Sequence, residues 1–284
     1  MGSRLLRMAL HVHRDPYPHL EFRHPLSGDQ LRVVPERGGL VTSWCCGGRE
    51  QLYFDAERFA DPSKSVRGGI PVLFPVCGNL PGNQLSLPQG VFPMAQHGFG
   101  RDLPWQLDEL DDGQGIRLQL SDSARSRASY PFGFQLSLEL RLEPRALAIA
   151  ACVEQRGGDG PMPYALGLHP YFQVSDLEQV RLEGFPAQCF NHLSGSEVPT
   201  ADQLRRLPEG VDLRVDLPEP EPQALRLNQL QLQLEPPFRH AVVWSDPPRS
   251  MVCLEPWSAV RGALSQQLLP GERQWLRCRY RVLD

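Results

Sequence analysis

Hydrophobic and polar residues alternate along several short stretches of the chain. In the clearest one, residues 134–143 (FQLSLELRLE), five apolar residues alternate with five polar or charged ones. Residues 116–120, 229–234 and 275–282 show the same alternation. Because successive side chains of a strand point to opposite faces of a sheet, this period predicts β-strands with one buried face. Residues 147–153 are apolar throughout, which predicts a strand that is covered on both faces.

Helical patterns are weak by comparison. Only residues 56–66 and 198–206 are compatible with a short helix. The chain contains 28 prolines spread along its length, which favours many turns and opposes long helices. Turn signals separate the predicted strands at Gly38-Gly39, Asp112-Gly113 and Gly157-Gly158.

The strand pattern continues along the chain without an internal repeat or an evident linker. A chain of 284 residues is long enough to bury a large core, and all-β folds of this length often form one domain. The short acidic segment 218–222 (PEPEP) is expected to be a surface loop. We therefore predict an all-β fold in which residues 1–284 form one large antiparallel β-sandwich with few short helices.

Charge and composition narrow the classes of partner. The net charge of −4 disfavours general binding to nucleic acid or to an anionic membrane. No apolar run approaches the roughly 18 residues of a membrane span, and residues 1–22 lack the apolar core of a secretory signal. The seven cysteines are odd in number and contain neither a C-x-x-C pair nor a zinc pattern. We therefore expect a cytoplasmic protein without a disulfide framework or a zinc site.

Two loop-like segments carry charged residues that need partners. Residues 66–80 (VRGGIPVLFPVCGNL) are strongly apolar, with the single cation Arg67 near their start. This arginine could bind a ligand or form a structural salt bridge, because a buried charge must be paired. Residues 96–105 (QHGFGRDLPW) place His97 and Arg101 among aromatic residues. That composition suits a sugar-binding loop, or equally a turn that is packed by its own aromatic side chains.

Two strand-like segments carry candidates for acid–base chemistry. Residues 164–172 (YALGLHPYF) contain His169 in an apolar run, where it is either a core histidine or an acid that works near neutral pH. Residues 251–259 (MVCLEPWSA) contain Glu255 at the end of a buried-looking strand. This glutamate could be a base beside Trp257, a flat ring on which a sugar would stack, or a strand-end residue exposed to solvent.

Taken together and in this order, these segments resemble the aldose 1-epimerase (galactose mutarotase-like) family. The resemblance extends from residue 38 to residue 282. Its first two motifs are similar to those of the branch that includes glucose-6-phosphate 1-epimerases. The motifs are R-G-G-I-P-V-L-F-P at 67–75, Q-H-G-F-G-R at 96–101, L-G-L-H-P-Y-F at 166–172, C-L-E-P at 253–256 and P-G-E at 270–272.

The resemblance implies a β-supersandwich with a sugar site on its concave face and a cofactor-free interconversion of the α and β anomers of an aldose. In this family a glutamate takes the proton of the C1 hydroxyl, and a histidine protonates the ring oxygen. The motif positions give these roles to Glu255 and His169. His97 matches a histidine that hydrogen-bonds the sugar. Arg67 matches an arginine that is associated with sugar phosphates. Arg67 and Arg101 could bind a phosphate or hold the catalytic glutamate in place.

The sequence also departs from the family pattern. Leu168 stands where galactose mutarotases commonly have asparagine, and residues 254–259 read L-E-P-W-S-A where the glucose-6-phosphate branch commonly has I-E-P-G. The family aspartate that binds sugar hydroxyls has no firm match; Asp212 is the first candidate and Asp176 the second. The expected substrate is a hexose or a hexose phosphate. Two alternatives are a sugar-binding protein without catalysis and a glycoside hydrolase or lyase, which usually needs two carboxylates.

Overall fold

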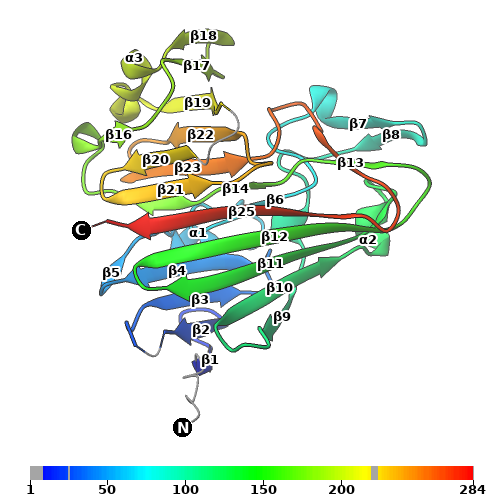
Figure 1. The fold of residues 1–284 in the computed structure, drawn as a ribbon, viewed down its shortest axis with the longest axis horizontal. Helices are drawn as coiled ribbons and strands as arrows, with labels where there is room; N and C mark the ends of the chain where they lie inside the picture. Colours follow the sequence, from blue (N-terminus) through cyan, green and yellow to red (C-terminus); the bar gives the residue numbers. More distant parts are fainter. Residues whose placement is uncertain (1–8, 25, 219–222, 284) are drawn as a thin grey trace.

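Strands dominate the computed structural model of the protein, which describes residues 9–24, 26–218 and 223–283 (Figure 1). These residues form 25 strands, three α-helices and four 3₁₀ helices. The prediction of an all-β fold with few short helices is therefore confirmed.

All five predicted strands lie in one antiparallel sheet of eight strands. They correspond to β10, β11, β12, β21 and β25, which are neighbours or near neighbours in that sheet. The order across the sheet is β16 (Leu182–Glu183), β20 (Gln223–Leu227), β21 (Leu230–Leu234), β25 (Arg273–Val282), β12 (Ala146–Gly157), β11 (Gly133–Glu143), β10 (Gly115–Ser121) and β9 (Gln106–Glu109).

A second sheet of eight strands packs against the first. Its path is β18 (Ser196–Pro199), β17 (Gln188–Asn191), β19 (Val211–Asp216), β22 (His240–Ser245), β23 (Met251–Trp257), β14 (Gly167–Leu168) and β6 (Val72–Leu73), and β15 (Tyr171–Gln173) also pairs with β23.

The N-terminal part forms a smaller sheet, and two hairpins complete the strands. The five-stranded sheet has the order β1 (Ala9–His13), β2 (His19–Arg23), β3 (Gln30–Val34), β4 (Leu40–Cys46) and β5 (Arg49–Glu50). The two-stranded pairs are β7 (Gln84–Leu87) with β8 (Gly90–Pro93) and β13 (Met162–Tyr164) with β24 (Gln266–Leu268).

The helices are short and lie between strands. α1 (Ala56–Ala60) is shorter than the predicted helix because Pro62 pushes the preceding Asp61 into an extended conformation. α3 (Thr200–Leu204) also occupies only the middle of its predicted range. α2 (Ala124–Arg127) was not predicted; a capping box from Ser123 starts it. The 3₁₀ helices are η1 (Pro81–Asn83), η2 (Gly100–Asp102), η3 (Leu177–Gln179) and η4 (Leu207–Glu209).

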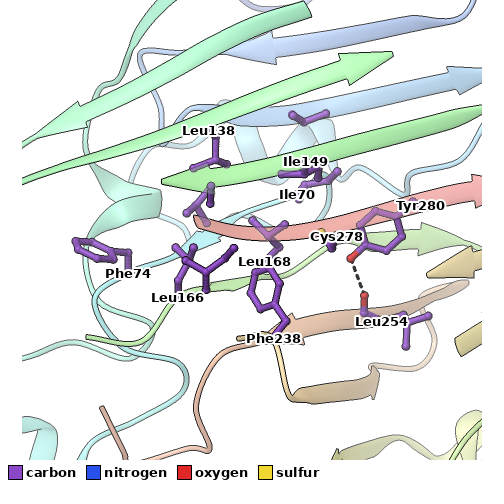
Figure 2. Packing of buried hydrophobic residues seen from close by; sticks show 14 of the residues in the cluster. Ile70, Phe74, Leu138, Ile149, Leu166, Leu168, Phe238, Leu254, Cys278 and Tyr280 are labelled. Carbon is purple, nitrogen blue, oxygen red and sulfur yellow. Dashed lines mark hydrogen bonds between the residues drawn. The ribbon is translucent and has the colours of Figure 1, made fainter. Parts of the chain in front are cut away.

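The main core fills the space between the two large sheets. Figure 2 shows Leu138 and Ile149 of the first sheet packed towards Leu166 and Leu168 of the chain that forms β14. The hydroxyl of Tyr280 in β25 donates a hydrogen bond of 3.1 Å to the carbonyl oxygen of Leu254 in β23, which ties the sheets together. Burial of apolar side chains at about 25 cal/mol per Å² makes this core the main source of stability.

One expectation from the sequence needs correction, and another concerns residues that the structure describes only in part. β12 was expected to be covered on both faces, but Ala148 and Ala150 on its outer face are only half-buried, because the described part of the chain leaves this face partly open to solvent. Residues 219–222 of the acidic segment lie outside the described residues, and Pro218 is exposed.

In the part of the chain that the structure describes, no helix has the length and apolar character needed to cross a membrane.

Candidate active site

Strand β23 separates the core of the protein from a polar cavity. Its alternate residues Val252 and Leu254 belong to the main core between the two large sheets. Cys253, Glu255 and Trp257 point to the opposite face, as the two-residue period of a strand requires. Every residue of this strand is buried, so the glutamate is held in a dry environment on the side of the sheet that faces away from the core.

A cavity of about 170 Å³ lies on this face of the second sheet. It brings together all seven residues that the sequence proposed for the site, from five segments that are distant along the chain. The second aspartate candidate, Asp176, lies elsewhere and caps η3. The lining residues are Ser65, Arg67, Gln96, His97, Arg101, His169, Tyr171, Asp212, Val242, Trp244, Glu255, Trp257 and Arg261.

His169 and Glu255 form a close pair in this cavity. The distance from His169 Nε2 to Glu255 Oε1 is 3.4 Å, and the side chain of Glu255 is only 1% exposed. The other carboxylate oxygen, Oε2, accepts a hydrogen bond of 3.0 Å from the indole N–H of Trp257. The ring of Trp257 is itself buried, so the structure gives this residue a contact with the glutamate that the sequence did not predict.

Burial shifts the pKa values of this pair in opposite directions. It raises the pKa of Glu255 well above its ordinary 4.5, although the hydrogen bond from Trp257 opposes this shift. Burial, and then the positive charge of Arg101, lower the pKa of His169 from 6.5 to about 3. Ordinary solution values therefore do not describe this pair. A single proton on the pair, held by Glu255 in the unliganded site, is the state that these shifts favour.

The backbone around His169 fixes its ring. The residue follows β14, and its N–H donates a hydrogen bond of 2.9 Å to the carbonyl oxygen of Pro71. The imidazole stacks on the ring of Tyr171, with centroids 4.7 Å apart, and meets Trp244 edge-on. Its Nδ1 atom is buried and has no hydrogen-bond partner, which leaves capacity for a ligand. Neither aromatic neighbour was proposed from the sequence, although Tyr171 lies within the same motif as His169.

His97 is held as a neutral hydrogen-bond donor. Its φ angle is +66°, and the following Gly98 lies so close to Phe74 that a Cβ atom there would come within 2.1 Å of a carbonyl oxygen. The Nδ1 atom of His97 accepts a hydrogen bond from the backbone N–H of Gly78, so the ring proton resides on Nε2. Burial lowers the pKa of His97 well below 6.5. A strained backbone at a cavity wall is typical of functional sites.

Arg67 and Arg101 bring positive charge to the cavity. The guanidinium of Arg67 donates to Ser65 Oγ and to the carbonyl oxygen of Val66, and lies 5.8 Å from the ring centroid of Trp244. Arg101 donates to the carbonyl oxygen of Gln96 at 3.0 Å. Within the described residues, no carboxylate lies within 4.0 Å of either guanidinium. The structural salt bridge considered for Arg67 is therefore not formed there.

Asp212 and Arg261 form an ion pair at the other side of the cavity. Their closest atoms, Asp212 Oδ2 and Arg261 Nη2, are 2.8 Å apart. Asp212 Oδ1 and Arg261 Nε are buried without a partner, so each could meet a hydroxyl group of a ligand. The sequence placed Asp212 among the candidates but gave no signal for Arg261.

The ligand-type atoms of His169, Cys253 and Glu255 lie within 4.8 Å of one another. Of these three residues only His169 and Glu255 line the cavity, and Cys253 does not.

Comparison with known proteins identifies the family. The sequence model described as aldose 1-epimerase matches residues 28–281. A Cenchrus ciliaris protein named "Putative glucose-6-phosphate 1-epimerase" is 32% identical over 158 residues, covering 52% of this chain and 45% of that protein. An Escherichia coli K12 protein of the same name is 27% identical over 183 residues, covering 62% and 56%. The match thus spans about half the length of each of these two curated relatives.

Solved structures extend the similarity to the whole fold. The Slr1438 protein from Synechocystis sp. PCC 6803 superposes with a TM-score of 0.86 at 32% identity, covering 93% of this chain and 95% of that chain. A galactose mutarotase related enzyme from Lactobacillus acidophilus superposes with a TM-score of 0.74 at 18% identity, covering 93% and 97%, and shares the fold. The predicted resemblance is confirmed, and the chain belongs to the aldose 1-epimerase family.

Proposed function

We propose that the protein is a mutarotase that interconverts the α and β anomers of a hexose phosphate. The contact of 3.4 Å between His169 Nε2 and Glu255 Oε1 carries this proposal. In an aldose the anomeric hydroxyl oxygen and the ring oxygen are bonded to the same carbon, C1. An acid and a base that serve these two oxygens must therefore stand side by side, as this pair does.

The reaction needs only proton transfers between this pair and the sugar. Glu255 takes the proton of the C1 hydroxyl while His169 donates a proton to the ring oxygen. The bond between C1 and the ring oxygen breaks and the C1 carbonyl forms. Rotation about C1–C2 followed by the reverse transfers closes the other anomer and restores the starting protonation. Each positioned group typically contributes about 10²–10⁴ to the rate.

The charge of the substrate influences whether Glu255 or His169 holds the proton of the pair. In the unliganded site burial favours a protonated Glu255 and a neutral His169. A phosphate group bound by Arg67 and Arg101 would offset two positive charges that lower the pKa of the histidine. This raises the pKa of His169 and so favours transfer of the proton from Glu255 to His169, which produces the carboxylate base and the imidazolium acid.

The two arginines also favour a phosphorylated sugar. Arginine binds phosphate through paired N–H donors, and neither Arg67 nor Arg101 is engaged by a carboxylate of the described residues. The cavity volume of about 170 Å³ is below the roughly 300–1,000 Å³ of pockets for drug-sized ligands, which suits a monosaccharide unit. The second carboxylate of the cavity, Asp212, is engaged by Arg261, which disfavours a two-carboxylate hydrolase.

Anomer-exchange NMR on the purified protein tests the proposal. Glucose, galactose and glucose 6-phosphate are compared at equal concentration and enzyme amount. We expect accelerated exchange for all substrates that bind, and the largest acceleration for glucose 6-phosphate. Binding of a sugar without any acceleration of its exchange would overturn the mutarotase and leave a sugar-binding protein on the same scaffold.

Replacement of Arg67 separates phosphate recognition from general damage. Arg67→Ala is expected to lower kcat/KM for glucose 6-phosphate by about 10- to 100-fold, because a hydrogen bond to a charged group contributes roughly 1.5–3 kcal/mol. The kcat/KM for glucose should change by less than about threefold by the same estimate. Arg67→Lys, which keeps the charge but not the planar fork, should fall between the two. An equal loss for both sugars would contradict phosphate recognition by Arg67.

Trp257 is expected to act by positioning Glu255. Trp257→Phe keeps a buried ring but removes the N–H that bonds Oε2, so kcat should fall about 10-fold or more, with little change in KM. Because this bond lowers the pKa of Glu255, its loss should also move the pH dependence of kcat upward. Trp275→Phe in β25, outside the cavity, is the matched control. A lower affinity for the sugar at unchanged kcat would instead support the stacking role that the sequence suggested.

A further inference from the structure

We propose that His13, His19 and Glu21 of the N-terminal hairpin bind a zinc ion at a site separate from the sugar cavity. The hairpin consists of β1 and β2 and lies at one edge of the five-stranded sheet. None of the three residues lines the cavity that contains Glu255. Their potential ligand atoms all lie within 4.8 Å of one another.

Strand register creates the cluster. His13 pairs directly with His19, and His11 pairs with Glu21, two residues further along each strand. Residues 11 and 13 share one face of β1, and residues 19 and 21 share the same face of β2. Opposite residues on one face have Cβ atoms about 4.5–5.5 Å apart, a separation that two side chains can bridge with an ion. The turn between the strands hides this arrangement in the sequence, where no zinc pattern was found.

Contacts of the hairpin orient two of the three ligands. Nδ1 of His19 lies 2.8 Å from the carbonyl oxygen of Tyr17, which can only accept, so this nitrogen carries the ring proton. Nε2 is then left with a lone pair for a metal. A carbonyl that fixes the tautomer of a ligating histidine in this way is typical of metal sites. Glu21 is oriented similarly, because Arg32 holds its Oε2 at 3.4 Å and leaves the other oxygen available.

The third ligand, His13, can rotate to complete the site. The rings of His13 and His19 lie parallel with centroids 5.0 Å apart, and His13 is exposed on the surface of the hairpin. Bonds of about 2.0–2.1 Å in a tetrahedral zinc site require ligand atoms about 3.3 Å apart, which a rotation of the exposed His13 side chain supplies. Two imidazoles and a carboxylate suit zinc better than calcium or magnesium, which prefer oxygen ligands. Water completes the fourth position.

Zinc bound here would join the edge strand β1 to its neighbour. Because the three ligands converge only when the hairpin is formed, zinc would bind the folded chain in preference to the unfolded one. At a zinc concentration of 100 times Kd, the melting temperature is expected to rise by about 5 °C or more. The sugar site does not depend on this ion, so failure of the zinc site would leave the proposed mutarotase untouched.

Isothermal titration of the tag-free protein with zinc chloride tests the site. The wild-type chain should bind one equivalent, and His13→Gln and His19→Gln should each lose about 10-fold or more in affinity. His11→Gln, on the same face but outside the three ligands, should retain affinity within about threefold by the same criterion. His13 is exposed, so its variant should keep the zinc-free melting temperature even if the buried His19 variant does not.

The cavity cluster provides a second control. Cys253→Ala removes one possible ligand next to His169 and Glu255 and should leave zinc binding unchanged. Absence of saturable binding to the wild type, full affinity in His13→Gln, or loss of binding in Cys253→Ala would each overturn the assignment to the hairpin.

Discussion

Glu255→Gln is expected to lower kcat for anomer exchange by a factor of about 10²–10⁴. The glutamine side chain has the same shape and its carbonyl oxygen can still accept the hydrogen bond from Trp257. It cannot take up the proton of the C1 hydroxyl. Affinity for glucose 6-phosphate should stay within a few fold, because the arginines that bind its phosphate are unchanged. Anomer-exchange NMR and titration calorimetry measure the two quantities on the same preparation.

A matched control shows that the loss is specific to the cavity. Glu139→Gln also replaces a glutamate on a strand, one that pairs with Arg117 at 2.9 Å outside the cavity, and it should keep wild-type turnover. Wild-type turnover in Glu255→Gln would rule out this residue as the base. A parallel loss of sugar affinity and kcat would instead indicate that Glu255 only holds the substrate.

The stability of this variant should move in the opposite direction to its activity. The folded-state pKa of Glu255 is raised above its ordinary 4.5, so the folded chain binds this proton more tightly than the unfolded chain. Stability is therefore lost as the pH rises from 4.5 through the folded-state pKa. Glutamine does not titrate and avoids this loss, so Glu255→Gln should melt at the same or a higher temperature than the wild type at pH 7. Catalytic residues often lower the stability of the folded protein in this way.

The sequence predicted the first sheet better than the second. Strands such as 134–143 have one face in the main core and one towards solvent, so their alternation is visible in the sequence. β23 is buried on both faces, and β6 and β14 have only two residues each, so these strands of the site produce no regular alternation. Their position follows from the packing of the sheets, which local pattern does not contain.

The same distinction explains which site residues were found. His169, Glu255, His97 and Arg67 lie in motifs whose glycines and prolines mark them in the sequence. Trp244 reaches the site because β22 pairs it with Cys253 on one side and Asp212 on the other. Such cross-strand neighbours, like the hairpin pair His13 and His19, exist only once the register is known.

Burial was the other quantity that the sequence could not supply. In solution, glutamate and histidine have pKa values near 4.3 and 6.5. The structure buries both groups, which reverses the order of their pKa values: the acid now holds its proton more tightly and the imidazole less tightly than in solution. Because the two groups lie close together, they share one proton, and we propose that the charge of the substrate changes which of them holds it.

His169→Asn is expected to lower kcat by about 10² or more, because asparagine can donate a hydrogen bond to the ring oxygen but cannot transfer a proton. The backbone N–H of this residue should keep its bond to Pro71, so the fold should be retained. His24→Asn is the control. His24 is also buried, and its Nδ1 accepts the backbone N–H groups of Leu26 and Ser27, a role that an asparagine oxygen can take over. Normal turnover in His169→Asn would rule out the histidine as the acid.

The protonation of His169 itself should respond to the substrate. In the free protein its pKa of about 3 lies far below pH 5, so its ring resonances, assigned by their absence in His169→Asn, should stay constant from pH 8 to pH 5. With saturating glucose 6-phosphate the phosphate offsets Arg101 and Arg67, so the pKa should rise and the same resonances should begin to shift at the acid end of this range. Glucose, which carries no charge, should produce a smaller change. A titration midpoint near 6.5 in the free protein would show that water reaches the pair, and the substrate-driven transfer of the proton would then have no physical basis.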